Sequence, residues 1–133
     1  RGDDARPVVR TLLALDREAG TMTFAGDMPM GARARFMKAN FDRLVDGAEG
    51  AARTATKSLG GAPATVALLI SCVGRKLVLQ QRVEEELDGV RDVLGASPVL
   101  AGFYSYGEIA PWATGGACTL HNQTMTVTTL REA

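Results

Sequence analysis

Residues 64–71, with the sequence ATVALLIS, form a short apolar run between two segments of helical periodicity. The run shows no alternation of polar and apolar residues, and it is too short for a typical helix. Both properties are typical of a central β-strand that is covered on both faces. A buried strand between two helical segments indicates a chain that packs helices against a sheet.

The two helical segments have clear boundaries. The first begins after Asn40, a good N-cap, and ends at Gly60-Gly61, which stops a helix. Its apolar face is rich in alanine, which permits close approach to a sheet or another helix. The second segment runs from about Arg75 to Leu94. Its apolar stripe consists of Leu79, Val83, Leu87, Val90 and Leu94.

Five further segments have the composition or alternation of strands. They are Val8–Leu15, Thr21–Ala25, Ala32–Lys38, Pro98–Tyr106 and Asn122–Thr129. The first two are separated by a turn-rich stretch and are expected to pair as a hairpin. Gly102 lies inside the fourth, where it indicates either a bulge or a site of close backbone approach. The order β-β-β-α-β-α-β-β predicts an α+β fold: a mostly antiparallel sheet of about six strands with two helices on one face.

Composition excludes several functions. A chain of 133 residues fits one domain, and its 15 basic residues balance its 15 acidic residues, so no net field attracts DNA. Aromatic residues are scarce at 5%, which argues against base stacking. The longest apolar run is about half of a bilayer span. Cys72 and Cys118 are expected to be unpaired thiols in the cytoplasm.

The segment Gly102–Thr126 concentrates the unusual chemistry of the chain. It combines the acidic tip Gly107-Glu108, the turn Ala110-Pro111 and the only histidine, His121. A glutamate in this setting is poor material for a helix or a strand. We therefore expect Glu108 to be exposed in a loop, where residues are free to act in function.

Two motifs in this segment, GFYSYGEI and HNQT, resemble the C-terminal motif of FIST domains. The upstream stretches LLISCVGRKLVLQQRVEEEL and RARFMKAN are similar to the same family. The resemblance implies that residues 1–133 are one C-terminal FIST domain, without the N-terminal half that normally precedes it. FIST domains are sensory domains of bacterial signalling proteins and also occur in some F-box proteins.

The resemblance also implies a function and partners. A FIST domain is expected to be non-catalytic, to bind a small polar ligand such as an amino acid, and to relay occupancy to a linked effector. The implied partners are the ligand, the N-terminal FIST domain of the same protein and a downstream signalling partner. A protein-interaction scaffold, as in the F-box relatives, is an alternative.

We expect one ligand pocket to be shared by three segments: Gly102–Pro111, His121–Thr124 and the Cys72–Arg75 turn. Each lies at the end of a predicted strand, where open sheets leave clefts. The candidate ligand-binding residues are Cys72, Arg75, Ser105, Gly107, Glu108, His121, Asn122 and Thr124. Backbone N–H groups at the start of the second helix could hold a carboxylate or phosphate. Equally, Cys72 could be a small buried residue and Gly74 could simply make the turn.

The sequence leaves several roles open for His121. A single axial histidine can hold haem, and some FIST-family proteins are described as haem-based nitric oxide sensors, so a haem sensor is a further alternative. His121 could also be a strand-edge residue with a satisfied hydrogen bond. Zinc is not expected, because there is no second histidine and no ligand cluster. A Cys72–His121 dyad would pair a nucleophile with a base, as in cysteine hydrolases, but no enzyme signature surrounds either residue. Haem is the one cofactor that the sequence and the resemblance leave open.

Overall fold

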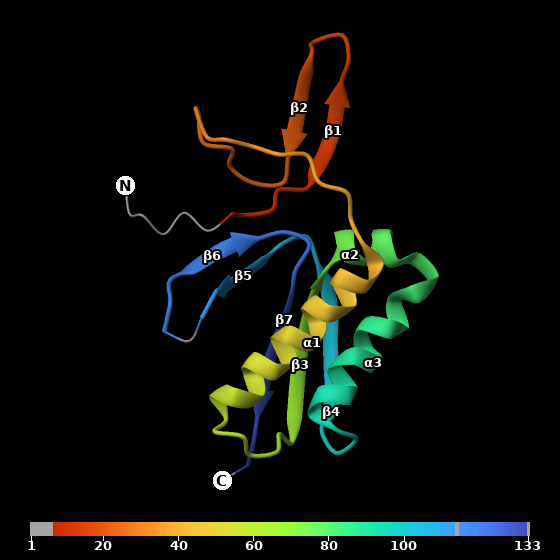
Figure 1. The fold of residues 1–133 in the computed structure, drawn as a ribbon, viewed down its shortest axis with the longest axis vertical. Helices are drawn as coiled ribbons and strands as arrows, with labels where there is room; N and C mark the ends of the chain where they lie inside the picture. Colours follow the sequence, from red (N-terminus) through yellow and green to blue (C-terminus); the bar gives the residue numbers. More distant parts are fainter. Residues whose placement is uncertain (1–6, 114, 133) are drawn as a thin grey trace.

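The computed structural model describes residues 7–113 and 115–132. Its centre is a sheet of three strands in the order β4-β3-β7 (Figure 1). The middle strand β3 (Val66–Cys72) is parallel to β4 (Val99–Ser105) and antiparallel to β7 (Met125–Leu130). At the contact with β3, a Cβ on Gly102 would collide with the carbonyl oxygen of Leu69. Close backbone approach, rather than a bulge, explains this glycine.

Two helices cover one face of the central sheet (Figure 1). They are α1 (Phe41–Ser58) and α3 (Val83–Leu94), and α1 is capped as expected by the side chain of Asn40. Small residues on α1 allow it to lie close to β7 and α3. The buried core consists of Ala48, Ala52, Ala67, Leu69, Val90 and Met125.

The second predicted helix is interrupted. It consists of α2 (Val73–Leu79), the 3₁₀ turn η1 (Gln80–Arg82) and then α3. The break occurs at Gln80, whose φ of 52° lies in the left-handed region. Because the chain changes direction there, α2 and α3 are not collinear and α3 can pack beside α1.

Two antiparallel hairpins lie outside the central sheet (Figure 1). The expected hairpin is confirmed as β1 (Leu12–Asp16) paired with β2 (Thr21–Phe24). It projects from the domain together with the segment that leads to α1, and we call residues 7–40 the N-terminal arm. The second hairpin pairs β5 (Glu108–Pro111) with β6 (Cys118–His121).

The α+β class is confirmed, with seven strands in the described residues and antiparallel pairing in three of four strand pairs. The strands form three small sheets rather than one. The strand predicted at Ala32–Lys38 is wrong: these residues form no strand, because they pair with no strand of the described chain. The β5–β6 hairpin was not predicted, since Glu108 had been assigned to a loop.

The central sheet has one open face, so the expectation that β3 is covered on both sides is wrong. Leu68 on β3 and its neighbours point away from the helices, and Phe103 on β4 is 60% exposed. Other exposed apolar side chains on this face are Val99 and Leu130. No helix within residues 7–113 and 115–132 is long and apolar enough to span a membrane.

Candidate ligand groove

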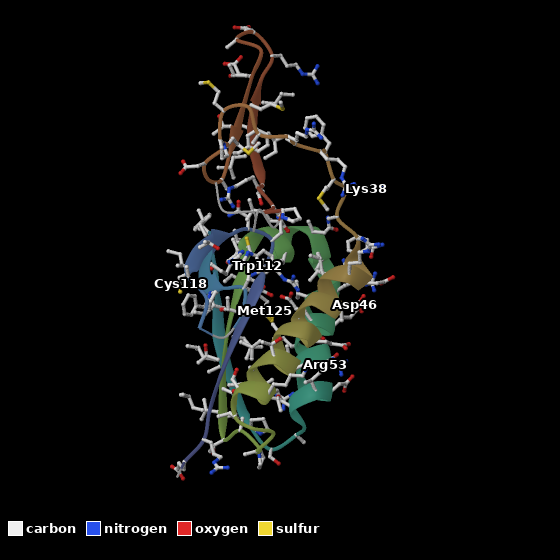
Figure 2. All side chains as sticks on the ribbon, turned by 60° about the vertical axis from the view of Figure 1, so that its left-hand side comes forward. Lys38, Asp46, Arg53, Trp112, Cys118 and Met125 are labelled. Carbon is white, nitrogen blue, oxygen red and sulfur yellow. The ribbon has the colours of Figure 1, made fainter. Side chains whose placement is uncertain are left out.

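A groove of about 700 Å³ lies between α1, β7 and the β5–β6 hairpin. Small residues of α1 form one wall, and the hairpin residue Trp112 forms part of the other. Successive residues of the β7 region, including Met125, form the floor. Figure 2 labels Trp112 and Met125 among the side chains of the domain. No aspartate or glutamate occurs among the described residues that line this groove.

Arg75 lies at the base of the groove and joins three elements. It is buried, and its Nε donates to Glu86 Oε2 on α3 at 2.9 Å. Its Nη2 donates to the carbonyl oxygen of Leu44 on α1 at 2.6 Å, and its Nη1 lies 3.4 Å from the carbonyl oxygen of Gln123. Charge-assisted bonds of this kind are strong and directional. They hold the guanidinium in one position beside the groove.

Glu108 corrects a sequence-based expectation. Its carboxylate is only 2% exposed, not at an exposed tip, and it begins strand β5 opposite His121. Ser105 Oγ donates to Glu108 Oε1 at 2.7 Å, and Thr124 Oγ1 donates to Oε2 at 2.7 Å. Pairing with β6 draws the residue inward, and the two hydroxyls replace water. Glu108 therefore ties β4 to the segment that enters β7.

His121 lines the groove and is oriented by its neighbours. Its Nε2 lies 2.9 Å from the carbonyl oxygen of Ala110, and 3.1 Å from Thr119 Oγ1. A carbonyl oxygen can only accept, so Nε2 carries the hydrogen and donates. The Nδ1 atom has no hydrogen-bond partner among the described residues. The ring meets Trp112 edge-on, with 4.7 Å between centroids.

Asn122 and Gln123 connect the groove to the N-terminal arm. Asn122 Oδ1 accepts from the backbone N–H of Thr11 at 3.2 Å, and Gln123 Nε2 donates to Thr11 Oγ1 at 3.3 Å. Gln123 has a φ of 58°, and its Oε1 is a buried atom without a hydrogen-bond partner among the described residues. Gly74 makes room for it, because a Cβ there would collide with the Gln123 amide.

Three of the sequence-predicted residues line the groove: Arg75, His121 and Thr124. Arg75 and Glu108 both reach the Gln123–Thr124 segment, so they lie on the same side of the domain.

The remaining predicted residues lie behind this surface. Ser105 binds Glu108, and Gly107 packs against Leu120 with a hypothetical Cβ at 3.0 Å. Cys72 is buried, and its backbone N–H donates to the carbonyl oxygen of Thr124 at 2.9 Å. Both Cys72 and Cys118 are free thiols.

Sequence reasoning missed two groove residues. Gln123 was not among the candidate ligand-binding residues. Its place in the HNQT motif was the available signal. Trp112, the only tryptophan, was also passed over, although it directly follows the Ala110-Pro111 turn.

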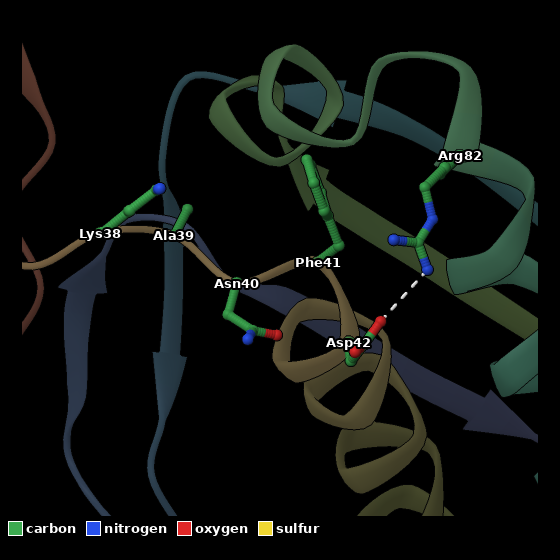
Figure 3. A pocket seen from close by; sticks show the side chains of 6 residues that line it. All are labelled: Lys38, Ala39, Asn40, Phe41, Asp42 and Arg82. Atoms are coloured by element: carbon green, nitrogen blue, oxygen red, sulfur yellow. Dashed lines mark hydrogen bonds and ion pairs between the residues drawn. The ribbon is translucent and has the colours of Figure 1, made fainter.

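A second hollow of about 450 Å³ lies at the start of α1 (Figure 3). Three of its polar residues, Asn40, Asp42 and Arg82, are engaged in the local structure. Asn40 Oδ1 accepts from the backbone N–H of Arg43 at 3.0 Å, and Asp42 pairs with Arg82 at 3.2 Å. This hollow is a helix start rather than a ligand site. In the described part of the chain no three His, Cys, Asp or Glu side chains are grouped to hold a metal ion.

The profile of the FIST C domain family matches residues 1–111. The chain belongs to this family, whose members are sensory domains associated with signal transduction. The match includes the GFYSYGEI motif and Arg75, and it ends one residue before Trp112, so the HNQT motif lies beyond it. No curated protein and no solved structure matches the chain.

Proposed function

We propose that this sensory domain binds a small polar ligand in the groove between α1, β7 and the β5–β6 hairpin. The observation that carries the proposal is Gln123, which lines the groove and whose buried Oε1 has no hydrogen-bond partner among the described residues. An unsatisfied buried acceptor costs about 1–3 kcal/mol. A ligand that donates a hydrogen bond to it recovers this free energy.

The other polar groups of the groove favour an amino acid or a similar metabolite. The ammonium group of such a ligand donates to Gln123 Oε1 or to His121 Nδ1, neither of which has a hydrogen-bond partner within residues 7–113 and 115–132. Its carboxylate is attracted by the guanidinium group of Arg43, which makes no ion pair with another described residue and lines the groove together with no acidic residue of the described chain. Thr124 completes the site, held in place by Glu108.

The same residues suggest how occupancy is relayed. Gln123 borders the groove and also donates to Thr11 in the N-terminal arm. A ligand that reorients the Gln123 amide alters this bond and shifts the arm. The arm exposes large apolar side chains, including Leu13, Phe36 and Met37, which suits contact with a linked effector.

Titration of the chain with the free amino acids tests the proposal. Trp112 is the only tryptophan and lines the groove, so its fluorescence reports occupancy. A ligand at a hundred times its Kd should also raise the unfolding free energy by about 2.7 kcal/mol. Gln123→Ala should abolish both responses, and the exposed Gln81→Ala should preserve them. If no amino acid changes the fluorescence or the stability, the proposed ligand class is wrong.

A second candidate function is protein contact through the open face of the central sheet. The exposed side chains of Leu68, Val99, Phe103 and Leu130 favour it, because contiguous exposed apolar surface marks interaction sites. The N-terminal FIST domain is the partner we propose. Phe103→Asp should then abolish association with that domain in a pull-down and leave the Trp112 response to ligand intact. Retained association would remove this candidate.

The haem alternative fits the geometry poorly. The Nε2 atom of His121 already donates to Ala110, and coordination would require that bond to break. The dyad of Cys72 and His121 is similarly disfavoured, because the Cys72 thiol is buried. We retain a cytoplasmic, non-catalytic domain as part of the proposal.

A further inference from the structure

The floor of the groove is a free strand edge. In the sheet order β4-β3-β7, β3 is the one strand in the described part of the chain that pairs with β7. The consecutive residues 124–128 all line the groove. Side chains alternate between the two faces of a strand, so a hollow that borders every residue in turn lies against the backbone edge.

The register identifies the backbone groups that face the groove. The N–H of Cys72 donates to the carbonyl oxygen of Thr124, so these two residues form a hydrogen-bonded pair. Such pairs alternate along antiparallel strands. The backbone groups of Thr126 and Thr128 therefore point to β3, and those of Met125 and Val127 point into the groove. No backbone hydrogen bond joins Met125 or Val127 to another described residue outside the β3 ladder.

We propose that an extended peptide segment binds in this groove as an added strand on the free edge of β7. An unpaired edge is a ready template for strand addition, in which main-chain hydrogen bonds give affinity and side-chain pockets give specificity. The inference rests on the groove of the proposed function and adds a second kind of occupant, a peptide, to the same groove.

The walls define the chemistry of the peptide. The α1 wall contributes Gly47, Gly50 and Ala51, which leave space for small or β-branched side chains. Arg43 lines one end, and its side chain makes no ion pair or hydrogen bond with another described residue. Since no acidic residue is found in the described lining, the peptide carries an acidic residue near Arg43.

The probe for the test is the blocked peptide Ac-Val-Thr-Val-Asp-NH₂, titrated against the full chain with Trp112 fluorescence as the readout. Two singly N-methylated versions, modified at the second or at the third residue, distinguish strand addition from other binding. Only one of these two amides faces β7, so one version should bind about tenfold more weakly and the other within about twofold of the parent. Replacing the aspartate with lysine should also weaken binding.

Val127→Pro tests the edge from the protein side. It removes an N–H that points into the groove and not to β3, so circular dichroism should be retained and peptide affinity should fall about tenfold. Equal losses from both N-methylated peptides would overturn the inference, as would the absence of any response to the parent peptide. A response to free amino acids alone would overturn it and leave the proposed function standing. A dimer that Val127→Pro dissociates, with no response to the peptide, would assign the edge to a second copy and also overturn it.

Discussion

Two groups of charged residues hold the α2–α3 region, and they differ mainly in their access to water. In the interior, Arg75 and Glu86 are 2.9 Å apart with side chains 3% and 0% exposed. On the surface, Arg82 and Glu85 are closer, at 2.6 Å, with side chains 41% and 43% exposed. The shorter pair is the weaker one, because solvent screens its charges and its side chains lose entropy when they pair. Distance alone does not rank these interactions.

The interior pair depends on complete satisfaction of its polar atoms. Besides Arg75, Glu86 accepts from Ser71 Oγ at 3.2 Å and from Tyr104 Oη at 3.3 Å. These donors compensate for the removal of the carboxylate from water. Because Arg75 also binds α1 and Gln123, the pair positions one side of the groove.

Glu86→Gln should cause the largest loss in unfolding free energy. It leaves the buried guanidinium of Arg75 without its counter-charge, and breaking a buried pair in this way typically costs about 3–5 kcal/mol. Urea unfolding followed by circular dichroism measures the loss. The matched control is Glu84→Gln, an exposed position on the same helix, which should change stability by no more than about 0.5 kcal/mol. Similar values for the two variants would mean that burial does not distinguish the interior pair.

Glu108→Gln should cause the next largest loss in unfolding free energy. The neutral amide cannot accept from both Ser105 and Thr124 as the carboxylate does, so we expect a loss of about 1–3 kcal/mol in unfolding free energy. The exposed Glu18→Gln, at the turn between β1 and β2, is the control. If stability is unchanged while binding of the ligand to the groove weakens, Glu108 acts on the ligand and not on the loop.

The contrast between the two groups also shows what the sequence could predict. Local signals were sufficient for α1, where Asn40 and Gly60-Gly61 act within a few residues, and for the β1–β2 hairpin. They were insufficient at Gln80, whose propensity is helical but whose φ is positive. On one continuous helix, residues eleven apart would be about 16 Å apart. The break therefore brings Arg75 and Glu86 together, and no periodicity predicted it.

The site shows the same limit. Of the eight candidate residues, Arg75, His121 and Thr124 line the groove, and their role in ligand binding stays a prediction. The exposure of Glu108 was predicted wrongly, because burial there comes from the hydroxyls of Ser105 and of the distant Thr124. Gln123 was missed since its significance depends on long-range contacts with Thr11 and Gly74. Contacts between distant segments carry no local signal.

Tyr104 extends the comparison to alkaline pH. Burial, with the negative charge of Glu86 and the hydrogen bond to it, raises the pKa of the Tyr104 phenol above its ordinary value. The fold therefore favours the neutral phenol. Its contribution to stability is complete below the unfolded pKa of about 10 and is lost as pH rises through the folded pKa. Between about pH 9 and 11, wild-type stability should fall more steeply than that of Tyr104→Phe. If the unfolding free energies of the two proteins, measured in urea, depend on pH in the same way, this prediction is wrong.

Arg82→Gln should have the smallest effect. The variant removes two bonds to Glu85, the pair with Asp42 and the contact of the guanidinium with the Phe41 ring at 5.1 Å. The hydrogen bond from Arg82 lowers the pKa of Glu85. The stabilisation is therefore present above the unfolded pKa of this carboxyl, and it is lost as pH falls through the folded pKa. Screening keeps the effect small at neutral pH, and about 1 M NaCl should reduce it further. We expect a shift in the urea midpoint smaller than that of any interior variant.

Arg91→Gln on α3, which removes no ion pair with another described residue, is the control. A salt-independent loss as large as that of Glu86→Gln would show that the surface group is as important to the fold as the interior one.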